Sequence, residues 1–349
     1  MTVNKRKAVA IWLLIGVFMI IVQVLLGGVT RLTGSGLSIT EWKPIMGALP
    51  PMNEQEWNHA FDGYKQIAQY KFLNAHFTLD DFKSIFFWEW FHRLWARLLG
   101  VVFALGFIYF LVRKYFDREM VIPFFILFLL GAAQGLIGWI MVASGLNNEN
   151  LYVNHIKLAI HFIAALVLLC YTLWFALKLL LKEEQRIFIP GFRNFTLFII
   201  GFLGLQLIYG AFMAGLKAAT YAPTWPDING VYIPENLSKL SWVNDPVNVQ
   251  FIHRLLAYTL GTLIIFWTGA AIRLSKQYPF KLFSATKWHP IWLVCLQIGL
   301  GITTVLLAPK MQPHHFGRYE AFAEMHQLVA MFLLVSLVIN LYIINKQKN

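Results

Sequence analysis

Eight long apolar segments constrain what this 349-residue chain can fold into. A transmembrane helix needs roughly 20 consecutive, mainly apolar residues, and eight stretches of the chain meet that requirement. They are residues 8–28, 85–112, 121–143, 156–181, 192–216, 249–272, 288–308 and 322–344. Only 13% of the residues are charged, against about 25% in a soluble domain. The sequence therefore predicts an all-α integral membrane protein with eight transmembrane helices.

The net charge of +12 is explained by membrane topology rather than by nucleic-acid binding. If the N-terminus is cytoplasmic, most lysines and arginines lie in the short cytoplasmic connections, as the positive-inside rule requires. An even number of spans returns the C-terminus to the same side. The short basic N-terminus lacks a Ser/Arg-rich presequence, which favours a bacterial inner membrane with both termini cytoplasmic.

Two motifs alternate along the eight segments. Every odd-numbered segment carries a Gln-x-x-x-Gly phrase, which begins at Gln23, Gln134, Gln206 and Gln297. Small residues allow helices to approach closely and glutamine hydrogen-bonds between helices, so we interpret this phrase as a packing motif. Every even-numbered segment carries a histidine near its predicted outer end, namely His92, His161, His253 and His326.

This alternation predicts two copies of a four-helix unit, residues 1–185 and 186–349. Both halves enter the membrane from the same side, so they are expected to be parallel repeats about an axis along the membrane normal. Each half is expected to form a four-helix bundle, which places cofactor sites between facing helices. Two long outer loops, residues 29–84 and 217–248, are expected to cover those sites.

The four histidines are the strongest chemical signal. Ionisable residues inside a membrane are costly and mark functional sites. Two histidines per half, near one face of the membrane, are what bis-histidine haem ligation requires. Zinc fits less well because the sequence has no Cys pair and no HExxH phrase. Cys170 and Cys295 are instead expected to pack as small hydrophobic residues.

Glu89 separates the two halves chemically. It lies three positions before His92, on the same helical face, whereas the matching position before His253 is Gln250. A carboxylate transfers protons or stabilises a cation, and an amide does neither. The first half is therefore the better candidate for catalysis, and the second for a holding or electron-transfer site.

The arginines that follow these histidines have two interpretations. Arg93 and Arg254 are suited to pairing with haem propionates, because guanidinium binds carboxylate in a bidentate manner. The alternative for Arg93 is an ion pair with Glu89 at i,i+4.

The remaining histidines are weaker candidates. His155 lies six residues before His161 and faces another direction, so we expect it at the membrane interface. His314 and His315 are candidates for the outer mouth of the second site.

The chain resembles the haem A synthase family, in its proteobacterial and mitochondrial branch. The resemblance covers nearly the whole chain. It rests on GGVTRLTGSGLS from Gly27, EWFHR from Glu89, TWP from Thr224, QFIHR from Gln250, and the stretches 206–216 and 297–304. The Gram-positive branch has a cysteine pair in its first outer loop and this chain has none, so no mechanism that relies on that pair applies.

The resemblance implies oxidation of the C8 methyl of haem O to a formyl group, through a hydroxymethyl intermediate. It implies substrate haem O at His92 and His161, with Glu89 needed for the chemistry. It further implies a haem b between His253 and His326. Expected partners are membrane lipid, haem O synthase, an electron acceptor and further copies of the chain.

Two other functions remain open from the residues alone. One is a dihaem electron-transfer cytochrome of the cytochrome b561 type, in which both haems are permanent. The other is a haem transporter or chaperone that releases its haem unmodified.

Overall fold

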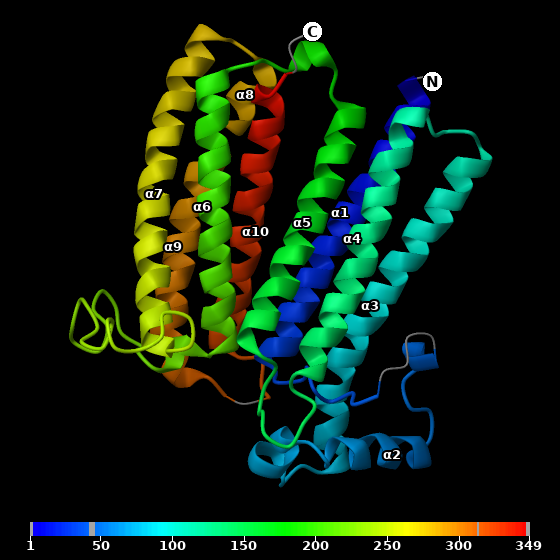
Figure 1. The fold of residues 1–349 in the computed structure, drawn as a ribbon, viewed down its shortest axis with the longest axis vertical. Coiled ribbons are helices and arrows are strands. Elements are labelled where there is room, and N and C mark those ends of the chain that lie inside the picture. Colours follow the sequence, from blue (N-terminus) through cyan, green and yellow to red (C-terminus); the bar gives the residue numbers. More distant parts are fainter. Residues whose placement is uncertain (1–2, 42–45, 313, 347–349) are drawn as a thin grey trace.

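The computed structural model describes residues 3–41, 46–312 and 314–346, and helices form their regular structure (Figure 1). Among these residues, eight helical stretches are long and apolar enough to span a membrane. They are α1 (Val3–Leu32), α3 (Leu79–Val112), α4 (Arg118–Ala143), α5 (His155–Leu180), α6 (Pro190–Gly215), α7 (Pro246–Gln277), α8 (Lys281–Thr286) together with α9 (His289–Leu307), and α10 (Arg318–Ile344). The predicted all-α membrane fold with eight spanning helices is confirmed.

Two of these helices begin well before their apolar segments. Helix α3 begins at Leu79 because the Thr78 hydroxyl accepts the N–H of Asp81, whose carboxylate in turn accepts the N–H of Thr78. Helix α7 begins at Pro246 and is capped by Asp245, which accepts the N–H of Asn248. Such caps satisfy backbone donors that have no partner within the helix. Polar first turns thus extend helices beyond the length that hydropathy predicts.

The spanning helices fall into two groups. Helices α1, α3, α4 and α5 lie on one side of the molecule, and α6, α7, α9 and α10 on the other (Figure 1). In the first group α1 packs against α3 and α5; in the second, α6 packs against α7, and α9 against α7 and α10. The groups meet where α5 contacts α6 and where α10 contacts α1 and α5. The division into residues 1–185 and 186–349, and the repeat relation between them, stay predictions.

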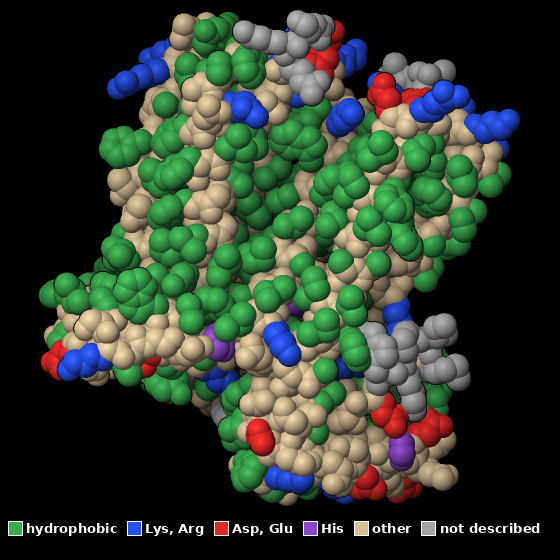
Figure 2. All heavy atoms as spheres, in the orientation of Figure 1, with side chains coloured by type: hydrophobic (Ala, Val, Ile, Leu, Met, Phe, Trp, Pro, Cys, Tyr) green, Lys and Arg blue, Asp and Glu red, His purple; other side chains and the backbone are tan. Residues whose placement is uncertain are grey.

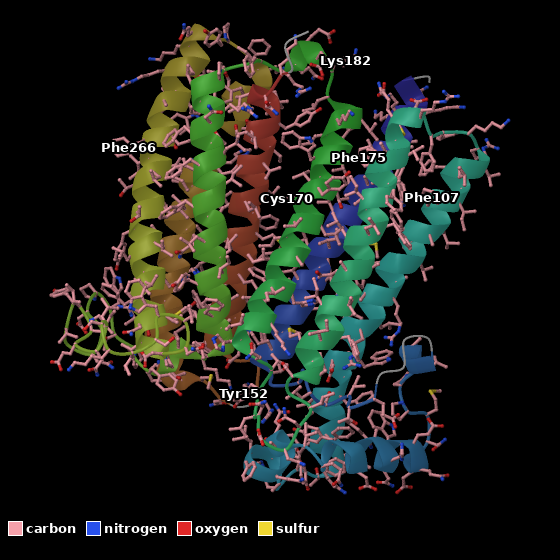
Figure 3. The ribbon with its side chains drawn as sticks, viewed as in Figure 1. Phe107, Tyr152, Cys170, Phe175, Lys182 and Phe266 are labelled. Carbon is pink, nitrogen blue, oxygen red and sulfur yellow. The ribbon has the colours of Figure 1, made fainter. Side chains whose placement is uncertain are left out.

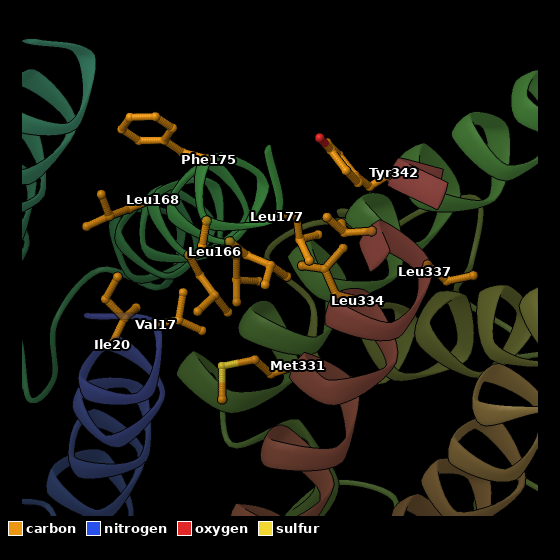
Figure 4. Close-up of a cluster of buried hydrophobic side chains, with 14 of the residues drawn as sticks. Val17, Ile20, Leu166, Leu168, Phe175, Leu177, Met331, Leu334, Leu337 and Tyr342 are labelled. Atoms are coloured by element: carbon orange, nitrogen blue, oxygen red, sulfur yellow. The ribbon is translucent and has the colours of Figure 1, made fainter. Parts of the chain in front are cut away.

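The core lies along this contact between the groups. Leu166 and Leu177 of α5 belong to the same buried cluster as Met331, Leu334 and Leu337 of α10 (Figure 4). Of the most apolar part of α10, 72% is buried, against 6% for α3. Helix α10 is therefore a central helix and α3 a peripheral one.

Apolar side chains cover the middle of the molecule, and charged side chains gather at its two ends (Figure 2). Phe266 of α7 is 66% exposed and projects from the outer side of the helix group (Figure 3). An apolar surface of this extent requires lipid around it. Cys170 packs against the core as predicted, whereas Cys295 is exposed, so the prediction that both cysteines pack inside is wrong for Cys295.

The long loops lie at the end opposite the two termini (Figure 1). The first contains η1 (Met46–Ala48), α2 (Glu54–Tyr64) and η2 (Tyr70–Asn74), and the second begins with η4 (Ala218–Thr220). Phe61 and Tyr64 of α2 stack with Phe82 of α3, with ring centroids 5.0 and 5.4 Å away. This aromatic contact fixes the first loop onto the end of α3. Two further short helices are η3 (Glu183–Gln185) and η5 (Ala308–Lys310).

Candidate functional site

The four predicted histidines lie on α3, α5, α7 and α10, two in each helix group. The rings of His253 and His326 face each other with centroids 6.3 Å apart. An imidazole nitrogen lies about 2 Å from a bound metal ion, so two imidazoles that share one iron have centroids roughly 6 Å apart. In the first group, His92 lies on α3 and His161 on α5. The spacing in the second group fits a haem iron between the two rings.

Each histidine lies against the glycine of a Gln-x-x-x-Gly phrase on a neighbouring helix. A Cβ atom at Gly138 would lie 2.8 Å from Cε1 of His161, and one at Gly301 would lie 2.8 Å from Cε1 of His326. A Cβ atom at Gly27 would lie 3.3 Å from the nearest atom of His92, and one at Gly210 would lie 3.4 Å from the nearest atom of His253. These glycines therefore make room for imidazole rings.

The glutamines of three of these phrases contact the same histidines. Their amide nitrogens lie 3.1 to 3.2 Å from a ring nitrogen in the pairs Gln134–His161, Gln206–His253 and Gln297–His326. Among the described residues, all four glutamine Oε1 atoms, that of Gln23 included, are buried without a hydrogen-bond partner. The phrase was predicted as a packing motif, and the structure shows that it also seats the histidines. The strict alternation of glutamine phrases and histidines along the chain is the signal that carries this pairing.

Glu89 is buried, with 2% of its surface exposed. Its Oε2 accepts hydrogen bonds from the Ser38 hydroxyl at 2.8 Å and from the Ile39 N–H at 2.9 Å. Its Oε1 is 2.5 Å from Arg93 Nη2, which confirms the ion pair given as an alternative. Both Ser38 and Ile39 belong to the first outer loop, which was not expected to supply partners for Glu89. Three donors hold the carboxylate in one orientation.

The arginines that follow the histidines hold the outer loops. Arg93 donates to the Ile39 carbonyl at 3.1 Å. Arg254 donates to the carbonyls of Thr224 and Asp227 at 2.6 and 2.7 Å. Pairing of these arginines with haem propionates stays a prediction.

The second half differs at the position that matches Glu89. Gln250 is fully buried, and its amide nitrogen donates to the Ala222 carbonyl of the second loop at 2.8 Å. The side chain of Gln250 thus attaches α7 to the second loop. In the first half, the Glu89 carboxylate accepts hydrogen bonds from its loop. The residue one turn before the histidine is therefore an acceptor towards the loop in the first half and a donor towards the loop in the second.

The weaker histidine candidates take structural positions. His155 lies at the start of α5, where its Nε2 is 2.9 Å from the Val243 carbonyl. His314 contacts the first half, and its predicted place at the outer mouth of the second site stays a prediction. Its ring nitrogens are 3.1 Å from the Thr33 carbonyl and 2.9 Å from Asn74 Oδ1, at a cavity of about 580 Å³ between the helix groups.

Sequence comparison places these features among known proteins. The family model for cytochrome oxidase assembly proteins, COX15-CtaA, matches residues 10–338. A protein called "Heme A synthase" from Rhodopseudomonas palustris is 41% identical over 317 residues, 87% of this chain and 83% of its own length. Another of that name, from Flavobacterium psychrophilum, is 36% identical over 98% of this chain and 100% of its own length. A third, from Caulobacter sp., is 38% identical over 95% of both chains.

Proposed function

We propose, for a chain that belongs to the COX15-CtaA family of cytochrome oxidase assembly proteins, that its two histidine pairs hold two different haems. The chain is an oxidoreductase that performs the haem A synthase reaction. The C8 methyl group of haem O is oxidised to a formyl group, through a hydroxymethyl intermediate, to give haem A for cytochrome c oxidase. Substrate haem O binds at His92 and His161, and haem b binds between His253 and His326.

The observation that carries this assignment is the contrast between Glu89 and Gln250. Both lie one turn before a histidine, and both are buried. Only Glu89 carries a charge, and three donors orient it. The half that contains Glu89 is therefore assigned to the substrate, and the half that contains Gln250 to the permanent haem.

Glu89 acts on charge that develops at the oxidised carbon. Each oxidation stage passes two electrons from the C8 methyl group to the electron acceptor and releases two protons, with the oxygen supplied by water, so positive charge builds up at the methyl carbon. A carboxylate held by Ser38 and Ile39 stabilises that charge or accepts a released proton without first having to reorient. When no haem O is bound, the positive charge of Arg93 neutralises the Glu89 carboxylate.

The second half fits a resident haem. The ring spacing of His253 and His326, and the room that Gly301 leaves for the ring of His326, support this assignment. Haem b bound there would supply one-electron transfer away from the first site. His253 and His326 would hold its iron, and Arg254 is a candidate partner for a propionate.

The cellular setting follows from the same arrangement. Both termini lie at one end of the molecule and the long loops at the other (Figure 1). We assign the end with the termini to the cytoplasm of a bacterial cell, which places both haem sites near the outer face of the inner membrane. Haem O synthase as supplier of substrate, an electron acceptor and self-association belong to this proposal.

The test is to express the chain beside a haem O synthase in a host without haem A, and to separate extracted haems by chromatography with mass detection. Haem A or its hydroxymethyl intermediate is expected only when the chain is present. The variant Glu89→Gln is expected to lower conversion by about 100-fold or more, the scale of a lost acid–base or charge-stabilising group. Gln250→Leu is the matched control in the other half and should retain the first-site chemistry.

The opposite results are equally clear. Full conversion by Glu89→Gln would contradict the role of the carboxylate. Unmodified haem O beside a folded, haem-loaded protein would instead favour the dihaem electron-transfer cytochrome.

A further inference from the structure

The ring of His161 lies against Gly138 in the same way as the ring of His326 lies against Gly301. A Cβ atom at Gly138 or at Gly301 would in each case lie 2.8 Å from Cε1, 3.3 Å from Nδ1 and 3.6 Å from Nε2 of the facing ring. The two rings are therefore equally oriented towards their neighbouring helices. Their hydrogen-bond partners nevertheless differ, and the difference determines which ring nitrogen carries the proton.

At His326 a main-chain carbonyl fixes the tautomer. Nδ1 lies 3.0 Å from the main-chain oxygen of Gln297, and a carbonyl oxygen only accepts hydrogen bonds. Nδ1 therefore carries the proton and Nε2 is the bare nitrogen. The side-chain amide of Gln297 lies 3.1 Å from Nε2 as a donor, which agrees with this tautomer. His326 thus carries its lone pair at Nε2, which binds iron once the amide of Gln297 gives way.

At His161 the glutamine amide fixes the opposite tautomer. Gln134 Nε2 lies 3.2 Å from the main-chain oxygen of His161, so this end of the amide must be the donor. The same nitrogen lies 3.2 Å from Nδ1 of the ring. Nδ1 therefore accepts a hydrogen bond, and the proton lies on Nε2. His161 cannot bind iron through Nε2 in this state.

Turning the amide of Gln134 by 180° would convert one tautomer into the other. Its buried Oε1, which has no partner among the described residues, would then accept a proton from Nδ1 and leave Nε2 bare. The turn breaks the bond to the main-chain oxygen of His161 and places two oxygens near each other. At His161 the tautomer that can bind iron is thus accessible but disfavoured, whereas at His326 it is the resting tautomer.

We propose that Gln134 is a positioning residue that makes His161 an exchangeable ligand, so that the first site releases its haem while the second retains it. This inference rests on the proposed function, in which the first site must take up haem O and release haem A. The second site holds a haem that never leaves. A histidine that returns to a non-ligating tautomer lowers the barrier to release.

The test measures how fast haem O leaves the first site. Full-length protein is purified with its second-site haem, loaded with ferric haem O under argon without an electron acceptor, and mixed with excess apomyoglobin. Gln134→Leu removes the donor that holds Nδ1 bare, and Gln134→Glu adds an acceptor for an Nδ1 proton. Release should become about threefold to tenfold slower, the effect of one neutral hydrogen bond, and slowest in Gln134→Glu.

A spectroscopic measurement separates this role from a merely structural one. The low-spin electron paramagnetic resonance signal of the first-site haem should grow in Gln134→Glu, because more His161 is bound to iron. The control is Ile122→Ala, at an exposed position on the same helix as Gln134, which should change neither this signal nor the release rate. The absorbance of the second-site haem also reports that each variant is folded.

The outcomes distinguish the two claims. Release that depends on His161, shown by His161→Ala, but proceeds at the wild-type rate or faster in both Gln134 variants overturns the inference and leaves the proposed function intact. Release that is the same in wild type and His161→Ala overturns both, because His161 is then no ligand of the substrate.

Discussion

At the scale of single residues, two glycines, Gly138 and Gly301, decide where the rings of His161 and His326 lie. Each belongs to a Gln-x-x-x-Gly phrase and faces a histidine of another helix. A Cβ atom closer than 3.0 Å to another atom forces a shift, and in a packed helical core the neighbouring ring has little room to move. The histidine positions therefore depend on residues that have no side chain of their own.

Substitution of Gly301 tests this dependence. Gly301→Ala places a methyl group 2.8 Å from Cε1 of His326, so the ring must turn away and the second-site haem is expected to be lost. The measurement is haem absorbance per mole of purified protein. Gly299→Ala on the same helix is the control, because no atom lies within 4 Å of its added Cβ, and it should keep its haem. Equal haem content in both variants would show that the glycine does not seat the ring.

At the scale of elements, the outer loops are held by the helices that carry the histidines. The Arg254 guanidinium binds two carbonyls of the loop that contains Thr224 and Asp227. The N–H of Gly230 holds the pKa of Asp227 below its ordinary value, so this carboxylate stays ionised at the turn. In the first half, Ser38 and Ile39 connect the first loop to Glu89 in a comparable way.

The variant Arg254→Lys tests the loop attachment. Lysine is a point donor and cannot span two carbonyls as the guanidinium fork does, so the loop should loosen. Cleavage by trypsin after Lys239, followed by mass spectrometry, is expected to be several-fold faster than in the wild type. Arg273→Lys, at an exposed position further along the same helix, is the control and should be cleaved at the wild-type rate. An unchanged rate in Arg254→Lys would mean that other contacts hold the loop.

At the scale of the whole molecule, the two helix groups are joined by the core around α5 and α10 and by contacts between their outer segments, among them one made by His314. His314 of the second half lies between the Thr33 carbonyl and Asn74 of the first, and its ring packs edge-on against Phe77 at 4.9 Å. Asn74 in turn donates to Tyr64 at 2.7 Å. Burial raises the pKa of Tyr64 to about 12, so this partner remains a neutral phenol.

Removal of the His314 ring should weaken the contact between the halves. His314→Ala leaves the buried Asn74 without this partner, which costs about 1–3 kcal/mol. The midpoint of thermal unfolding in detergent is expected to fall by a few degrees. The neighbouring His315→Ala should leave the midpoint unchanged, since that side chain is exposed. A midpoint that falls equally in both variants would contradict a specific role for His314.

The sequence by itself determined the number of spanning helices, because a span requires only a local run of apolar residues. It also identified the four histidines and the contrast between Glu89 and Gln250, because charges are rare within apolar segments. The helical repeat gave the ion pair of Glu89 with Arg93 as one of two interpretations of that arginine. These features share one property: each depends on residues that are near one another in the chain.

Only the tertiary structure decided the contacts between distant segments. It brought Ser38 to Glu89, a glycine to each of the four histidines and a glutamine to three of them, and His314 to the opposite half. Helix packing sets these distances, and packing depends on how ridges of side chains fit together rather than on the order of residues. The glutamine phrases were visible in the sequence, but their partners became known only once the helices stood side by side.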